Sequence, residues 1–499
     1  MQRRLINAME ENAELKTVAV RYCIFNLLIL ILLLSAFAAS ISEAWASDSE
    51  PELTANQNNY ILEEAALLSA DIEKTFEALK TIPPAITFLG GARNREEDRC
   101  FVTAVETGSL IAEFSIPICT GGGTGIMEFV PRGYLKARKN GAGSLSNPSI
   151  PVKPALAAGT KSIDCRTQAF IIKLPNEQKA NPFIEVFTEL RTLPIRKLAL
   201  MENKIGFAFF PGGFGTMDEF YELWDLKCRG KISAPVALAG CRFWQEHLTV
   251  IEKAAVKSRN LITGPELSMV SESTVDEPSE IISVLFRNEA SVKIESDPEK
   301  KASLLKKDID RASEYYSHKK DAVVFLGSPG IFAHDTAYAT ALSISMQCAH
   351  LGIPLRTGAG GNVARAVVYG AGEGRERPDV QAFLLQNDVI ASGKPGLTIA
   401  TVESTVIHKA FISKKMRALV VLPGDVHTLS ELFGILCLMQ NNMIERKPVI
   451  LIGKSFWIPI VLTLKKTMCE GERMLIAPGD LSLITVIDSP EEAMALIAP

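Results

Sequence analysis

The two halves of the chain carry the same pattern of residues, and this internal repeat constrains the fold more than any other feature. Residues 85–90 (AITFLG) recur as residues 322–327 (AVVFLG), and Pro211-Gly212 recurs as Pro423-Gly424. Residues 235–244 also recur as 448–457, with Pro, Gly, Phe and Trp at matching places. A repeat on this scale predicts tandem duplication of one domain of roughly 200 residues.

Within each copy, short apolar runs alternate with helical patterns. Apolar residues at three- and four-residue steps predict a helix over 61–79, which Pro83-Pro84 ends. Strands are predicted at 85–89 and 116–119, with a helix reaching about residue 113 between them. This alternation predicts an α/β fold of two tandem Rossmann-like, doubly wound parallel-sheet domains. Such domains bind ligands at the carboxyl ends of the strands.

The chain is long enough for several domains, with 499 residues and 47% hydrophobic content. We expect a signal peptide or membrane anchor at 1–46, a linker at 47–59, the first copy at 60–294, a charged linker and lead helix at 295–320, and the second copy at 321–499.

Residues 22–42 carry no charge, and basic residues precede them while acidic residues follow. A cleaved signal peptide and an uncleaved anchor both fit, and a buried helix of a soluble domain is the third alternative. The first two predict export or membrane association through residues 22–42. A start at a later methionine such as Met9 would instead leave the chain cytoplasmic.

Composition excludes several classes of function. The net charge of −4 and the pI of about 6.0 give no basic field for nucleic acid. The nine cysteines form no CxxC pair, so buried free thiols are expected. The six histidines form no HExxH pattern, so no metal site is predicted.

A Gly-rich turn, PGGFGTMDE at residues 211–219, follows an apolar run and opens a helix expected to begin near Met217. Glycines allow backbone N–H groups to approach an anion, and the helix dipole favours negative charge, so the turn predicts a phosphate site. Thr216 and Glu219 also fit a capping box, which would need no ligand.

A second Gly-rich turn, TGGGTGIME at residues 120–128, follows the strand at 116–119. The second copy departs from both turns. Asp425 and His427 replace two glycines of the first copy, and His408 aligns with Arg196. Asp425 would repel a phosphate, so we predict that the second copy keeps the fold without the chemistry.

Four motifs together resemble the LOG ("lonely guy") family: TGGGTGIME at 120–128, LPNEQ at 174–178, Arg196-Lys197 and PGGFGTMDE at 211–219. Members are Rossmann-like nucleoside 5′-monophosphate phosphoribohydrolases, long mislabelled as lysine decarboxylases. The resemblance covers most of the first copy and is weak in the second. Thr124 and Asp218 depart from residues common in the family. No Ser-x-His-Lys stretch for a pyridoxal Schiff base is present.

The resemblance implies hydrolysis of the N-glycosidic bond of a nucleoside monophosphate, with Glu219 and Arg196 as catalytic residues. It implies no cofactor and no metal. The candidate substrate- and phosphate-binding residues are Gly212, Gly213, Gly215, Thr216, Gly121, Gly122, Gly125, Met127, Lys197 and Gly90.

The chemistry suits these residue types. A carboxylate can stabilise an oxocarbenium-like ribose and activate water, and Arg196 could orient the nucleotide or stabilise charge on the departing base. The alternatives are a nucleotide- or molybdenum-cofactor carrier or sensor of the same superfamily, and a membrane-tethered scaffold. Family members form homodimers, so we expect the two copies to pack as an intrachain pseudo-dimer, with a further homo-oligomer possible.

Overall fold

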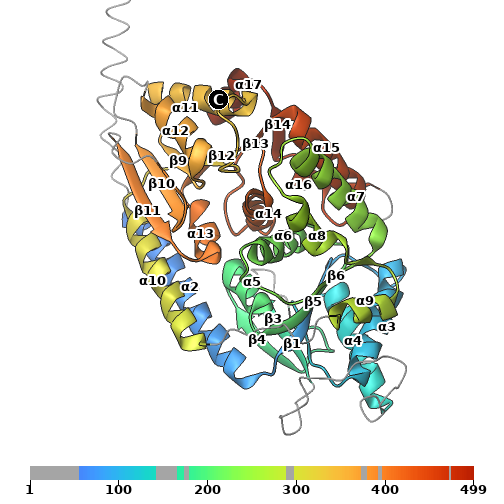
Figure 1. Cartoon of the computed structure of the whole chain (residues 1–499). Helices are drawn as coiled ribbons and strands as arrows, with labels where there is room; N and C mark the ends of the chain where they lie inside the picture. The colour runs from blue at the N-terminus through green and yellow to red at the C-terminus, as the bar shows by residue number, and fades with distance from the viewer. Residues whose placement is uncertain are drawn as a thin grey trace, which may run out of the picture. The chain divides into compact units, whose positions relative to one another are not determined.

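The computed structural model describes residues 55–141, 166–173, 179–287, 297–372, 379–390, 396–470 and 474–498. It contains two seven-stranded parallel sheets with flanking helices (Figure 1). Their strand orders, β4-β3-β2-β1-β5-β6-β7 and β11-β10-β9-β8-β12-β13-β14, are the same order repeated. The predicted fold class, two doubly wound α/β domains, is therefore confirmed.

The first copy spans α2 to α9. Its strands are β1 (Ala85–Leu89), β2 (Ile118–Thr120), β3 (Thr167–Ile172), β4 (Val186–Leu190), β5 (Lys204–Phe209), β6 (Val236–Ala239) and β7 (Thr274–Val275). Its helices are α2 (Ala55–Thr81), α3 (Arg99–Glu113), α4 (Ile126–Lys139), α5 (Leu193–Met201), α6 (Phe214–Cys228), α7 (Cys241–Ile251), the π-helical turn η1 (Glu252–Lys257), α8 (Gly264–Ser271) and α9 (Pro278–Leu285).

The second copy repeats this order. Its strands are β8 (Ala322–Leu326), β9 (Leu355–Thr357), β10 (Val380–Leu385), β11 (Leu397–Val402), β12 (Met416–Val421), β13 (Val449–Ile452) and β14 (Ile484–Ile487). Its helices are α10 (Pro298–Ser317), α11 (Thr336–His350), α12 (Gly361–Gly372), α13 (Thr405–Ile412), α14 (Val426–Gln440), α15 (Lys454–Leu464), η3 (Lys465–Cys469), α16 (Pro478–Leu481) and α17 (Pro490–Ile497).

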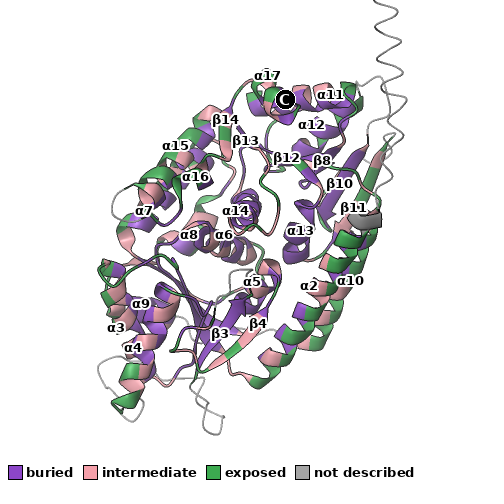
Figure 2. Ribbon diagram, turned by 180° about the vertical axis from the view of Figure 1, so that it is seen from behind, coloured by how far each residue is buried: buried purple, intermediate pink, exposed green. Residues whose placement is uncertain are grey.

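The central strands are mostly apolar and are buried along their whole length because helices cover both faces of each sheet. Every residue of β1, β5 and β8 is buried (Figure 2). The predicted bounds of β1 are confirmed, and α2 ends before Pro83-Pro84 as expected. The exposed polar faces of α2 and α10 contrast with the buried strands.

The two copies pack against each other through α6 and α14, which lie side by side (Figure 1). The Tyr221 and Phe433 rings stack with centroids 5.1 Å apart, and Phe214 meets Phe433 at 6.0 Å. One continuous apolar core contains residues of both copies. This contact supports the expected pairing of the two copies within one chain. A further homo-oligomer stays a prediction.

The expectation of export or membrane anchoring is corrected. Within the part of the chain that the structure describes, no helix is both long and apolar enough to cross a bilayer. Residues 22–42, on which the expectation depended, lie outside the described residues, as do the 142–165 loop and the LPNEQ motif at 174–178. Export and membrane association therefore have no support.

Candidate active site in the first copy

The two Gly-rich turns meet at the carboxyl ends of β1, β2 and β5. The Gly91 N–H donates to the Pro211 carbonyl at 3.0 Å, and the Ile126 N–H donates to the Gly91 carbonyl at 3.2 Å. Gly90 lies directly beneath α4, because a Cβ there would come within 2.8 Å of the Ile126 side chain. Gly90 therefore serves the close packing of strand and helix that joins the turns.

The helix after the main turn begins earlier than the sequence suggested. It starts at Phe214, with Gly213 as N-cap, so Thr216 is its third residue. Thr216 and Glu219 therefore do not form a capping box, and that alternative is wrong. Because a glycine N-cap has no side chain to accept a hydrogen bond, the first N–H groups of α6 remain suited to an anionic ligand.

The structure brings Arg196 and Glu219 together. Arg196 Nη1 lies 3.6 Å from Glu219 Oε1, and both side chains are largely buried. Arg196 Nε donates to the Phe170 carbonyl at 3.0 Å, and Nη2 lies 3.5 Å from the Gly121 carbonyl and 3.9 Å from Met127 Sδ. The two predicted catalytic residues thus lie beside the second Gly-rich turn.

A buried aspartate on α2 fixes the start of the helix that carries Arg196. Asp71 Oδ2 accepts the N–H groups of Arg191 and Thr192, each at 2.8 Å, and the Thr192 hydroxyl at 2.7 Å. In the second copy Asp308 holds the residues before α13 in the same way. Sequence reasoning missed Asp71, although its match with Asp308 in the aligned lead helices was a usable signal.

The environment of Glu219 changes its protonation. Burial raises the pKa of Glu219 to about 7, although the neighbouring Arg196 guanidinium lowers it. A carboxyl with a pKa near the working pH can exchange protons with water or substrate efficiently. Glu219 therefore has the properties of a general base or a charge-stabilising group.

Lys197 follows Arg196 in the chain but faces another direction, since successive helical residues differ by about 100°. Lys197 Nζ lies 2.6 Å from Asp218 Oδ1 and 3.3 Å from Glu222 Oε2. Lys409 of the second copy also binds Glu222, at 2.5 Å. The structure thus places Lys197 in an ion-pair network between the copies, where it contacts Asp218 rather than the glycines of the 211–219 motif.

The remaining predicted glycines shape the two turns. Gly122 and Gly125 have φ of +73° and +65°, which side chains disfavour. A Cβ on Gly212 would lie 2.1 Å from Thr216 Oγ1, so the main turn closes tightly on its helix. Asn181, which sequence reasoning missed, donates to the Gly123 and Met127 carbonyls at 2.8 and 3.0 Å and holds the second turn.

The second copy contributes to this site. A Cβ on Gly215 would find Cys437 Sγ at 3.8 Å, and a Cβ on Gly213 would lie 2.8 Å from Ile476 Cγ2. Neither Cys437 nor Ile476 could be predicted, because their approach depends on how the copies pack. The site of copy one therefore has a wall made by copy two.

The equivalent turn of the second copy is capped by its own side chain. Asp425 Oδ1 accepts the Thr428 N–H at 3.0 Å and the Thr428 hydroxyl at 2.9 Å. The Asp425 carboxylate therefore takes the position at the helix N-terminus that a phosphate would need. This supports the prediction that copy two lacks the phosphate site.

Gly121→Ala is expected to lower activity without unfolding the chain. The new Cβ would lie 1.9 Å from Arg196 Nη2 and 2.6 Å from Met127 Sδ, and these flexible ends must move. Displacing a catalytic group by about 1 Å can cost about 100-fold in rate. We therefore expect turnover to fall by about 10- to 100-fold, which steady-state kinetics would measure. Gly264→Ala, at a position with open space, is the matched control.

Comparison with known families bears directly on the repeat. The model of the family described as possible lysine decarboxylase matches residues 148–285 and 371–497, which together make up more than half of the chain. The chain belongs to this family. One match falls in each half, so the possible lysine decarboxylase repeat is present in tandem. This confirms the family that the motifs indicated, under its older description.

Two solved structures resemble parts of the chain. One is an X-ray structure of TM1055, a structural genomics target, with 14% identity, 41% of this chain and 99% of that chain covered, and a TM-score of 0.28. The other is the molybdenum cofactor binding protein from the phototrophic bacterium Rippkaea orientalis, with 17% identity, 40% and 94% covered, and a TM-score of 0.25. No curated protein matches the chain.

Proposed function

We propose that the first copy hydrolyses the N-glycosidic bond of a nucleoside 5′-monophosphate, releasing the free base and ribose 5-phosphate. The observation that carries the proposal is the approach of Arg196 and Glu219 to 3.6 Å beside a helix N-terminus with a glycine N-cap. A helix N-terminus suits a phosphate group, and the carboxylate and guanidinium suit the reacting end of the nucleotide.

In the proposed reaction, the α6 N-terminus and the turn at Gly212, Gly213 and Gly215 bind the 5′-phosphate. Water attacks C1′ as the C1′–N bond breaks, and Glu219 accepts a proton from that water while stabilising the positive charge on the ribose. The bond electrons leave with the base. Arg196 stabilises the negative charge that develops there.

The test measures ribose 5-phosphate released by the full chain from a panel of purine, pyrimidine and modified-adenine nucleoside monophosphates. Turnover of at least one member that saturates with substrate supports the proposal and gives the base preference. Saturable binding of a nucleotide with no product would favour a carrier. Absence of both turnover and binding would overturn both the hydrolase and the carrier hypotheses.

The second candidate function is nucleotide binding without turnover, as in a carrier or sensor. It is favoured by the buried Arg196–Glu219 ion pair, in which each group already neutralises the other. A bound phosphate or base would then compete with Glu219 for Arg196, and this contact would give affinity without bond cleavage.

The pH dependence of kcat/KM tests whether Glu219 is the general base. Because Glu219 must be ionised to act as a base and burial raises its pKa to about 7, kcat/KM should rise with pH and level off above about 7. Since Arg196 lowers the pKa of Glu219, Arg196→Gln should move this acidic limb to higher pH. Arg196→Lys keeps the charge and should move it less. An acidic limb at the same pH in both variants would show that Glu219 is not the titrating group.

A further inference from the structure

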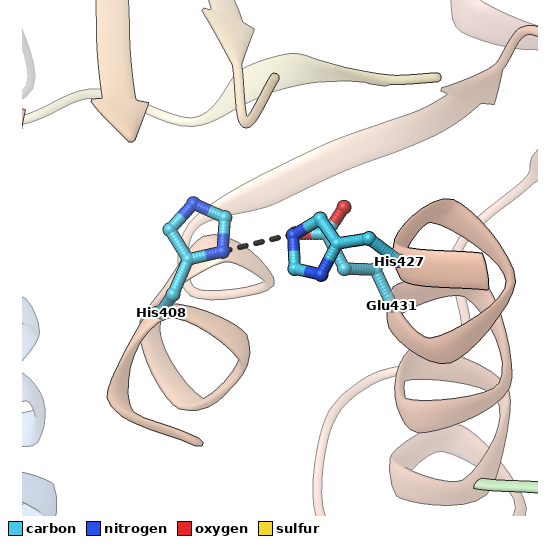
Figure 3. A group of neighbouring side chains, drawn as sticks. All are labelled: His408, His427 and Glu431. Carbon is cyan, nitrogen blue, oxygen red and sulfur yellow. Dashed lines mark ion pairs between the residues drawn. The ribbon is translucent and has the colours of Figure 1, made fainter. Parts of the chain in front are cut away.

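Three polar side chains of the second copy converge at the position that corresponds to the catalytic pair. His408 takes the place of Arg196, Glu431 takes the place of Glu219, and His427 replaces Gly215. His408 Nδ1 lies 2.9 Å from Glu431 Oε1, and His427 Nε2 lies 3.7 Å from the same oxygen. Figure 3 shows the three side chains pointing toward one another from α13 and α14.

The three atoms that face one another are buried and approach one another at ion-pair distances. Among the described residues, these atoms meet no partner with the geometry of a regular hydrogen bond, and the contacts given for them are the two approaches to Glu431 Oε1. His408 and Glu431 are 0% and 1% exposed, and His427 is 17% exposed. Two imidazole nitrogens that converge on one buried carboxylate oxygen call for an explanation.

The outward-facing atoms of both imidazoles, by contrast, are held. His408 Nε2 lies 2.8 Å from the Phe383 carbonyl, and His427 Nδ1 lies 3.0 Å from Asp225 Oδ2 of the first copy. A backbone carbonyl and a carboxylate are the usual partners of the second nitrogen of a metal-binding histidine. They fix the tautomer and aim the free nitrogen at the metal.

We propose that His408, His427 and Glu431 form a binding site for a divalent first-row transition metal such as Zn²⁺. The three ligand atoms all lie within 4.8 Å of one another. Zinc bonds of about 2.0–2.1 Å in a tetrahedron separate ligand atoms by about 3.3 Å, close to the two observed distances. Two imidazoles and one carboxylate select such a metal over Mg²⁺ or Ca²⁺, which prefer oxygen ligands.

The proposed metal site of the second copy differs from the nucleotide site proposed for the first copy. His427 occupies the sequence position of Gly215 in copy one, so a potential metal ligand replaces a glycine of the proposed phosphate turn. The Asp225 carboxylate, from copy one, ties the site to the contact between the copies. Three protein ligands leave a fourth position for water or a small anion.

The test uses the full chain, stripped with a chelator and titrated with Zn²⁺ alone by calorimetry and elemental analysis. We expect one Zn²⁺ per chain. His427→Gln and Glu431→Gln should weaken binding more than about 100-fold, and Asp225→Asn about 10-fold or more, the scale of outer-partner losses. Glu219→Gln, the positional counterpart in copy one, and His334→Gln, at an exposed histidine, should bind as the wild type does.

Circular dichroism establishes that each variant is folded. Co²⁺ bound to the wild-type chain gives a second readout that needs no substitution, since nitrogen and oxygen ligands in a tetrahedral arrangement produce strong visible absorption. Stoichiometric Co²⁺ binding without this spectrum would overturn the proposal. So would Zn²⁺ binding of equal affinity in wild type and His427→Gln, or no saturable binding near one equivalent.

Discussion

Glu219→Gln should reduce ribose 5-phosphate release by about 1,000-fold, within the range of about 10²–10⁴ for a general acid–base group. The amide keeps the shape of the side chain and can still meet Arg196 at the 3.6 Å ion-pair position, but it cannot accept a proton. Steady-state kinetics with the preferred nucleotide measure the effect. Glu299→Gln, at a side chain that is 81% exposed, should keep wild-type turnover.

Glu219→Gln should also gain stability relative to the wild type as the pH rises. Since burial raises the pKa of Glu219 from its ordinary value of 4.5 to about 7, the contribution of Glu219 to stability is complete below pH 4.5 and is lost as the pH rises through 7. This pKa shift of Glu219 corresponds to at most about 3 kcal/mol in the free energy of unfolding. Urea denaturation should show that the free energy of unfolding of Glu219→Gln, relative to wild type, is higher at pH 8 than at pH 5.

For the kinetic prediction, turnover by Glu219→Gln above one-tenth of wild type would exclude Glu219 as the base.

Glu222→Ala is expected to lower the free energy of unfolding by about 3–5 kcal/mol, the usual cost of breaking a buried ion pair. Glu222 accepts from Lys197 at 3.3 Å, Lys409 at 2.5 Å and the Thr405 hydroxyl at 3.1 Å, and is 1% exposed. Its removal leaves Lys409 with Ser430 as its remaining close partner in the network. Chemical denaturation near pH 7.5 measures the loss.

The pH dependence of stability provides an independent check on Glu222. Burial would raise the pKa of Glu222, but Lys409 and Lys197 outweigh it and lower the pKa to about 2. Its contribution is therefore present above about pH 4.5 and is lost as the pH falls toward 2, and Glu222→Ala should lack this part of the acid sensitivity. Glu299→Gln should change stability by less than about 0.5 kcal/mol. A loss under 1 kcal/mol in Glu222→Ala, below the range for buried pairs, would contradict the network.

Much of the fold could be predicted because it depends on local patterns. β1 was placed correctly since apolar residues bounded by proline and glycine have few other solutions. The start of α6 was placed too late, because Thr216 and Glu219 imitate a capping box while the helix already begins at Phe214. A glycine N-cap gives little signal in a sequence rich in glycine.

The candidate site was only partly predictable. Arg196, Glu219, Gly121 and Met127 are brought together as the family motifs indicated. Lys197 turned toward Asp218, a direction set by helix rotation. The approach of Cys437 to Gly215 depends on contacts between residues more than 200 positions apart. In the sequence, His408 and His427 indicate lost chemistry, since nothing in their spacing shows that they converge with Glu431.

The ion-pair network between the copies is not symmetric. Glu222 serves both lysines, and its counterpart in the second copy is Gly434, where a Cβ would already lie 3.2 Å from Asp218 Oδ1. Two first copies facing each other would place the glutamate of one against the Asp218 carboxylate of the other, with an excess of negative charge. The first copy is therefore poorly suited to pair with a duplicate of itself. The two halves therefore complement each other at this network, and replacing one by the other would require changes in its neighbour.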